Sequence, residues 1–191
     1  MANEILRILR LLIESGGERL SIRRISLLRK VNYKTAYNAV MQLSEEGIVR
    51  LEKLGNTTNC YFAQRFNPLV LAAEYGRRDE LLRDKDIKVL QGKLDVLPFP
   101  FVALVFGSYA KGGAKRGSDI DLLAVCEKER VGELESAVSL LPLKIHLTAV
   151  TPEEFIKMAR SREFSVVSEA MRGNVVLVGV EDYYRLVQHV G

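Results

Sequence analysis

The sequence predicts an α+β protein in which a helical segment joins two folded domains. In residues 3–46, apolar side chains recur at helical spacing, and strand-like segments follow in residues 48–63. Residues 69–97 show a helical pattern again, and from Phe101 onward strand-sized apolar runs alternate with helical segments. We therefore expect the following parts: an N-terminal domain at residues 1–66, a helical connector at 67–97 and a C-terminal domain at 98–191.

The composition is typical of a globular protein, with 48% hydrophobic and 27% charged residues. No apolar run approaches the roughly 18 residues that a membrane-spanning helix needs, and the N-terminus lacks the layout of a secretory signal. Two cysteines, Cys60 and Cys126, and two histidines, His146 and His189, are too scattered for a zinc site. We expect a cytoplasmic protein with reduced cysteines and no membrane partner.

Basic residues concentrate in the N-terminal third of the chain. Residues 1–66 contain 11 Lys and Arg against 6 Asp and Glu, whereas residues 67–191 contain 17 against 18. A basic domain fits a nucleic-acid-binding module, because it attracts the phosphate backbone. A solvated basic surface would have the same charge.

The N-terminal domain is expected to contain helices followed by a β-hairpin. The expected helices span residues 3–14, 21–28 and 33–46. Each has apolar side chains on one face, and the first and third end at glycines. The strand-like residues 48–54 and 60–63 flank a turn-forming cluster at residues 55–59. This order resembles a winged helix-turn-helix domain over roughly residues 3–65.

The resemblance to a winged helix implies binding of double-stranded DNA by a homodimer, with the third helix in the major groove. The expected DNA contacts come from that helix, from the basic residues before it and from the wing: Arg23, Arg24, Asn32, Tyr33, Lys34, Thr35, Asn38 and Lys53. Asn side chains can pair with adenine edges, and Lys can bind phosphate or guanine. Alternatively, the module serves dimerisation or protein contact, with its tyrosines packed away.

The connector is expected to be largely helical and to pack onto the C-terminal domain. Its apolar residues form one continuous stripe, with these members: Ile87, Leu90, Leu94 and Leu97. Pro98 and Pro100 end it.

The C-terminal domain contains the residues best suited to chemistry. An apolar strand at 101–106 ends at Gly107-Ser108, and ten residues separate this pair from Asp119-Ile120-Asp121. Gly107 permits a sharp turn beside an approaching phosphate, and Ser108 can cap the next helix, whose free N–H groups would face an anion. Strand alternation places Asp119 and Asp121 on one face, where two carboxylates suit Mg²⁺.

The pattern Gly-Ser, ten residues, Asp-x-Asp resembles the signature of the minimal nucleotidyltransferases, which are relatives of DNA polymerase β. The resemblance covers about residues 98–185 and implies a polymerase-β-like domain with a small mixed sheet flanked by helices. It implies that Asp119 and Asp121 bind Mg²⁺ and that a nucleoside monophosphate passes from a nucleoside triphosphate to an acceptor hydroxyl. The residues expected to bind the triphosphate are Gly107, Ser108, Lys111, Lys115 and Arg116. Small domains of this family often resemble antitoxins that modify a helical toxin, so a small helical partner protein is a possible acceptor.

The third acid that active members of this family usually carry is missing. Counting back from Thr151-Pro152-Glu153-Glu154-Phe155, its position holds His146. Three roles for this histidine remain open: an inward side chain held by a hydrogen bond, a substitute catalytic base, or part of a remnant site that binds nucleotide without transfer. In the last case the protein is a DNA-binding transcription regulator. Four acids elsewhere in the sequence are alternatives for the missing one: Glu153, Glu154, Glu181 and Asp182.

Overall fold

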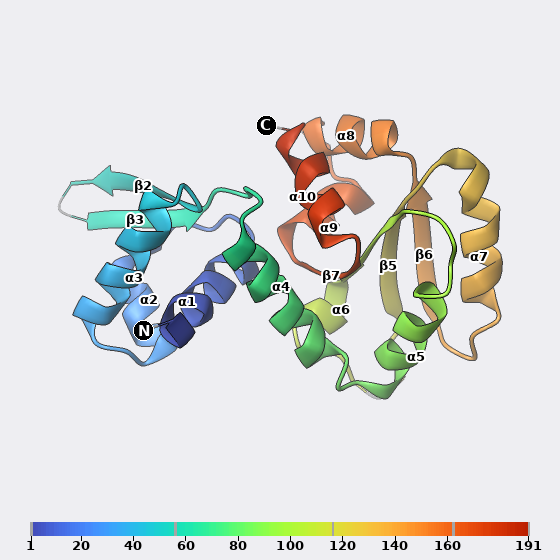
Figure 1. Ribbon diagram of the computed structural model, residues 1–191, viewed down its shortest axis with the longest axis horizontal. Helices are drawn as coiled ribbons and strands as arrows, with labels where there is room; N and C mark the ends of the chain where they lie inside the picture. Colours follow the sequence, from blue (N-terminus) through green and yellow to red (C-terminus); the bar gives the residue numbers. More distant parts are fainter. Residues whose placement is uncertain (1, 56, 116, 162, 191) are drawn as a thin grey trace. The chain divides into compact units, whose positions relative to one another are not determined.

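The computed structural model describes residues 2–55, 57–115, 117–161 and 163–190 (Figure 1). The chain divides into two compact units, Met1–Glu74 and Tyr75–Gly191. Helices combine with a three-stranded and a four-stranded sheet, which confirms the predicted α+β class. The boundary between the units falls inside helix α4 (Pro68–Leu81). No helix in the described ranges is long and apolar enough to cross a membrane.

The N-terminal unit combines helices with an antiparallel sheet. Its elements are α1 (Ala2–Glu14), β1 (Leu20–Ser21), α2 (Ile22–Arg29), α3 (Tyr33–Glu45), β2 (Val49–Leu54) and β3 (Thr57–Phe62). The strand order is β1-β3-β2. Helices α2 and α3 both begin at side-chain caps: Ser21 accepts a hydrogen bond from the Arg24 N–H, and Asn32 accepts one from the Thr35 N–H. These caps fix where each helix starts, so α3 begins as the sequence predicts.

The hairpin of this unit is tighter than expected. Leu54 pairs directly with Thr57, so only Gly55 and Asn56, which lies outside the described residues, separate the two strands. The prediction of a five-residue turn at 55–59 is therefore wrong: Thr57 already belongs to β3. Its threonines suit an extended strand as well as a turn, and only the pairing with β2 decides between them.

The C-terminal unit is built on a mixed sheet of strand order β6-β5-β4-β7. Its strands are β4 (Val102–Phe106), β5 (Ile120–Val125), β6 (Ile145–Val150) and β7 (Asn174–Val178). Its helices, besides the end of α4, are α5 (Lys85–Leu94), α6 (Gly107–Ala110), the 3₁₀ turn η1 (Lys128–Arg130), α7 (Val131–Ser139), α8 (Pro152–Arg160), α9 (Val166–Arg172) and α10 (Val180–Gln188). Strands β5 and β6 are parallel, whereas β4 is antiparallel to both of its neighbours. This is the small mixed sheet flanked by helices that was expected.

Two layers of helices enclose this sheet (Figure 1). On one face, alternate strand residues such as Val105 and Leu122 join a buried apolar cluster with Leu90 of α5 and Leu134 of α7. Helices α9 and α10 contact the strands β4, β5 and β7. Burial of both faces explains why β4 and most of β5 and β7 are continuous apolar runs.

The connector is not one continuous helix. It consists of α4 and α5, and the chain breaks between them because Asp84 caps α5 by accepting hydrogen bonds from the N–H groups of Asp86 and Ile87. Ile87, Leu90 and Leu94 are buried in the apolar cluster of the C-terminal unit. Three of the four residues in the predicted stripe thus form the buried apolar face of α5, whereas Leu97 follows the end of the helix and is partly buried against the same cluster.

Both cysteines are buried and unpaired. Cys60 lies in the N-terminal unit, where its thiol donates a hydrogen bond to the carbonyl of Leu20. Burial raises the pKa of the Cys60 thiol to about 12, and burial also raises the pKa of Cys126. Since the thiolate is the reactive form, neither side chain is suited to nucleophilic chemistry.

Candidate active site

One row of residues crosses the C-terminal sheet where strand β4 ends. Phe106 pairs with Asp121 of β5 on one side and with Asn174 of β7 on the other. Asp121 in turn pairs with His146 of β6. Residues directly opposite each other in a sheet share a face, so the row brings together side chains that lie far apart in the sequence. Asp119 is the second residue before Asp121, and it precedes β5 on the same face.

The side chains of His146, Asp119 and Asp121 converge at this edge of the sheet. Nε2 of His146 lies 3.6 Å from Oδ2 of Asp119, and Nδ1 of His146 lies 3.7 Å from Oδ1 of Asp121. Both distances exceed a normal hydrogen bond. The side chains are 70%, 43% and 33% exposed, in the order His146, Asp119, Asp121. His146 is therefore not an inward histidine held by a hydrogen bond. It faces solvent beside the carboxylates.

The backbone bend at Gly107 lies directly against the carboxylate of Asp121. Gly107 has a φ of +66°, and a Cβ atom built there would lie 2.1 Å from Oδ2 of Asp121. A side chain would therefore be strained by the backbone conformation and would also overlap the carboxylate. The two halves of the sequence motif thus meet at one point.

The expectation that Ser108 caps the next helix is wrong. Helix α6 starts at Gly107, its N-terminal cap is Phe106, and within the described part of the chain no side chain makes a capping hydrogen bond there. Ser108 lies within this single helical turn, and its carbonyl accepts a hydrogen bond from the N–H of Gly113 at 2.9 Å. The bend itself begins the helix, so Ser108 lies two residues after the cap position and cannot cap it.

Two of the basic residues between the two motifs, Lys111 and Lys115, are exposed. Lys111 ends α6, and Lys115 opens a turn in which its N–H donates to Oγ of Ser118 at 2.8 Å. The Ser118 N–H donates back to the carbonyl of Lys115 at 2.9 Å. This turn directs the chain into Asp119. Arg116 lies outside the described residues.

The acids considered as substitutes for the missing carboxylate lie elsewhere. Glu154 forms a capping box with Thr151, and Glu153 lies beside it in the first turn of α8. Thr151 follows the last residue of β6, whereas His146 is near the first, so both glutamates are at the far end of that strand from His146. Glu181 and Asp182 both pair with Arg185 of α10. They follow Gly179, which packs against the carbonyl of Phe101 before the start of β4. The candidate site lies where β4 ends, so these acids are at the opposite edge of the sheet.

The donor atoms at the site suit a magnesium ion only in part. Within the described ranges, no group of three His, Cys, Asp or Glu side chains is arranged to hold a metal ion. Asp119 and Asp121 supply two carboxylates, and Mg²⁺ is commonly held by one or two carboxylates together with water and phosphate oxygens. The nitrogens of His146 are poor ligands for Mg²⁺, which prefers oxygen. The carboxylate pair therefore fits an ion that is shared with a bound triphosphate.

The residues expected to bind DNA are mostly exposed in the N-terminal unit. The exposed ones are Arg23, Arg24, Asn32, Tyr33, Lys34, Asn38 and Lys53, and Thr35 is partly buried. The side-chain oxygen of Asn32 is already bonded to the Thr35 N–H, at 2.8 Å. Tyr33 stacks on Tyr37, with ring centroids 6.3 Å apart, and both are exposed, so the tyrosines are not packed away.

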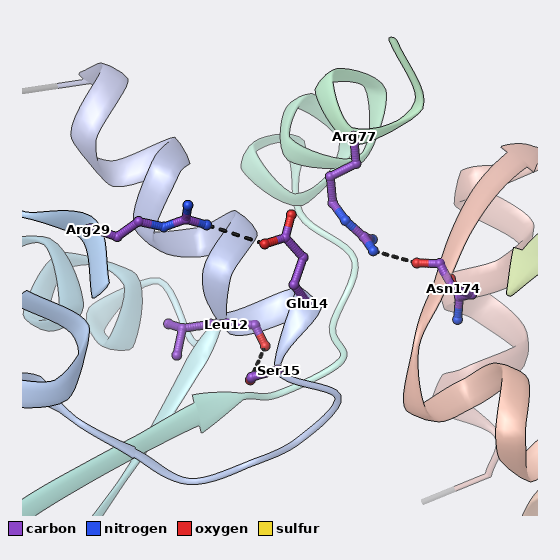
Figure 2. Close-up of polar contacts among 6 residues, drawn as sticks. All are labelled: Leu12, Glu14, Ser15, Arg29, Arg77 and Asn174. Atoms are coloured by element: carbon purple, nitrogen blue, oxygen red, sulfur yellow. Dashed lines mark hydrogen bonds and ion pairs between the residues drawn. The ribbon is translucent and has the colours of Figure 1, made fainter. Parts of the chain in front are cut away.

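Arg29, near Arg23 and Arg24 in the sequence, forms an ion pair within the N-terminal unit. Arg29 pairs with Glu14 at 3.3 Å, which links α2 to α1 (Figure 2). This ion pair leaves Arg29 less suited to a phosphate contact than its exposed neighbours Arg23 and Arg24.

A family model matches the part of the C-terminal unit that contains the candidate site. Residues 94–171 match the family model of the nucleotidyltransferase domain, and this range includes the Gly107 bend, Asp119, Asp121 and His146. A solved structure described as a crystal structure of the toxin-antitoxin with AMP-PNP is 19% identical, with a TM-score of 0.35. The match covers 56% of this chain and 85% of that chain. No curated protein matches the chain.

Proposed function

We propose that the nucleotidyltransferase domain at residues 94–171 transfers a nucleoside monophosphate from a nucleoside triphosphate to an acceptor hydroxyl. One observation carries the proposal: the Gly107 bend lies so close to Asp121 that a Cβ atom there would be 2.1 Å from its carboxylate. A phosphate that approaches over the glycine therefore meets the Asp119 and Asp121 pair at once. The proposed reaction needs the glycine bend and the two carboxylates to act on the same phosphate, and their close contact allows this.

In the proposed reaction, the acceptor oxygen bonds to the α-phosphorus. The bond from that phosphorus to the oxygen bridging the β-phosphate breaks, and pyrophosphate leaves with the electron pair. His146 accepts the hydroxyl proton, since an imidazole can act as a base near neutral pH. Asp119 and Asp121 hold Mg²⁺, which when bound neutralises negative charge on the phosphates.

The other residues of the motif bind the triphosphate in this proposal. Gly107 and Ser108 present the backbone of the bend, and the three basic residues that follow in the sequence contact phosphate: Lys111, Lys115 and Arg116. The acceptor is a hydroxyl of a small helical partner protein, as in an antitoxin that modifies its toxin. The half-exposed carboxylates and the exposed His146 support this choice, because an open site admits a macromolecular acceptor.

Labelled ATP tests the proposal directly. The protein is incubated with α-labelled ATP, Mg²⁺ and candidate partner proteins, and covalent label is followed by gel. We expect Mg²⁺-dependent label on a partner, and none when a chelator removes the metal. Absence of both label transfer and binding of a fluorescent ATP analogue, measured by titration, would contradict the proposal.

A second function is favoured by His146 itself, which stands where active family members have an acid. Under this alternative the domain binds nucleotide without transferring it, and the protein is a DNA-binding transcription regulator. We propose that its N-terminal unit is a winged helix, since its order α1-β1-α2-α3-β2-β3 has a hairpin after the third helix. Exposed basic residues such as Arg23, Arg24 and Lys34 support contact of a homodimer with double-stranded DNA.

The DNA-binding alternative predicts a steep dependence on salt. If each copy of a homodimer contacts phosphate through Arg23, Arg24, Lys34 and Lys53, affinity should fall about 10³- to 10⁵-fold between 50 and 200 mM salt. Fluorescence anisotropy with labelled duplexes measures this. Lys34→Ala should lower the salt slope by about two for a dimer. Negligible affinity for DNA of any sequence at low salt would exclude this function.

Replacement of His146 by Asp distinguishes the two functions. If His146 is the base of an active enzyme, His146→Asp should give no more than about a twofold gain in label transfer, and His146→Ala should lower the rate about 10²-fold or more. Initial rates with labelled ATP measure both. A gain above about tenfold in His146→Asp would show that the natural site is impaired, and it would favour the regulator.

A further inference from the structure

Contacts from several helices meet at Asn174, the first residue of β7. The Asn174 side chain is buried, with 7% of the residue exposed. Its amide nitrogen donates hydrogen bonds to the carbonyl of Ala170 in α9, at 2.8 Å, and to the hydroxyl of Tyr183 in α10, at 3.0 Å. Arg77 of α4, which is also buried, donates to the main-chain carbonyl of Asn174 (Figure 2). One residue therefore ties β7 to α4, α9 and α10.

The sequence contains only a weak sign of this network. Asn174 is a polar residue that opens the apolar run Val175–Val178. A turn residue before a strand is the simplest interpretation of such a position. The pairing partners of Asn174 are visible only in the folded unit.

Asn174 lies one strand away from the candidate site. It pairs with Phe106, the residue that precedes the Gly107 bend, and the other partner of Phe106 is Asp121. Strand β7 is at the outer end of the sheet order, so among the described strands it pairs with β4 alone. The contacts with α4, α9 and α10 hold this outer strand in place, and β7 in turn supports the end of β4.

We propose that Asn174 is a positioning residue for the nucleotide site. Its network holds the end of β4 so that the Gly107 bend stays packed against the carboxylate of Asp121. The proposal rests on the proposed function, because it concerns how that site binds its triphosphate. The backbone at Gly107 is packed tightly against Asp121, because a Cβ atom added to Gly107 would overlap Oδ2 of Asp121. A small shift of the strand end therefore moves the bend and the carboxylate relative to each other.

Two variants and one matched control test this role. Asn174→Ala removes the amide, and Tyr183→Phe removes one hydroxyl while keeping the ring. Val176→Ala is the control, because Val176 is fully buried in the same strand but pairs with Leu104, two residues before the strand end. Affinity for a fluorescent ATP analogue with Mg²⁺ is compared with the free energy of unfolding from urea titration. Hydrogen exchange of the Gly107 amide reports on the bend without nucleotide.

We expect Asn174→Ala to weaken nucleotide binding about 10- to 100-fold, the size of effect that a misplaced binding group produces. Tyr183→Phe should weaken it less, and Val176→Ala by no more than about twofold at a similar loss of stability. Exchange at Gly107 should accelerate in Asn174→Ala and Tyr183→Phe but not in the control.

Two outcomes would overturn the proposal, and a third would contradict the proposed function on which it rests. If Asn174→Ala and Val176→Ala lose affinity equally at equal loss of stability, Asn174 is only structural. If Asn174→Ala does not fold, Tyr183→Phe decides, and unchanged affinity with unchanged exchange at Gly107 overturns the role. A wild-type chain that binds no nucleotide contradicts the proposed function instead, and Gly107 exchange then still shows whether the network reaches the bend.

Discussion

Replacing both Asp119 and Asp121 with Asn is expected to lower label transfer from ATP at least about a thousandfold, to the level of background. The amide has the shape of the carboxylate but lacks its charge, so the variant keeps the packing around Gly107 while losing the groups that hold the metal. The strands should survive, because both side chains are at least one-third exposed. The measurement is the initial rate of α-label transfer at saturating Mg²⁺.

The control for the double variant removes the same two charges elsewhere. Glu181→Gln combined with Asp182→Asn changes the net charge equally, at the opposite edge of the sheet, where both acids pair with Arg185. Its transfer rate should stay within about twofold of wild type, since exposed ion pairs contribute little to stability. Label transfer that survives the loss of Asp119 and Asp121 would remove these residues from the mechanism.

Gly107→Ala is expected to weaken nucleotide binding about a hundredfold or more. The added Cβ would lie 2.1 Å from Oδ2 of Asp121, so either the bend or the carboxylate must move. A displacement of about 1 Å at a binding group is enough for an effect of this size. Titration with a fluorescent ATP analogue in the presence of Mg²⁺ measures the change in affinity.

Gly112→Ala separates overlap with Asp121 from backbone strain. Gly112 has a φ of +67°, almost the same as Gly107, but a Cβ atom there would meet nothing within 4 Å. Both variants carry the strain of alanine at positive φ, about 1 kcal/mol or more. Only Gly107→Ala should lose nucleotide affinity strongly. If the two variants bind nucleotide equally, the contact between bend and carboxylate is not what the site requires.

Local patterns in the sequence were sufficient to locate most elements and the motif. The strand before Gly107, the Asp-x-Asp strand start and the cap at Thr151 depend on neighbours within a few residues, and such features can be inferred from spacing alone. Features with two local interpretations were missed. Thr57 suits a turn or a strand, Asp84 suits a helix interior or a cap, and Ser108 suits a cap or a first helical turn.

The sequence by itself determined which residues make up the candidate site: a glycine at the end of an apolar strand, two aspartates at the start of another, and a histidine where an acid was expected. Only the tertiary structure decided that His146, Asp121, Phe106 and Asn174 form one row across the sheet. The register of a sheet depends on the packing of segments far apart in the chain, and no local pattern encodes it. That register exposes His146 beside two carboxylates, and it pairs Asn174 with Phe106, the residue before the Gly107 bend.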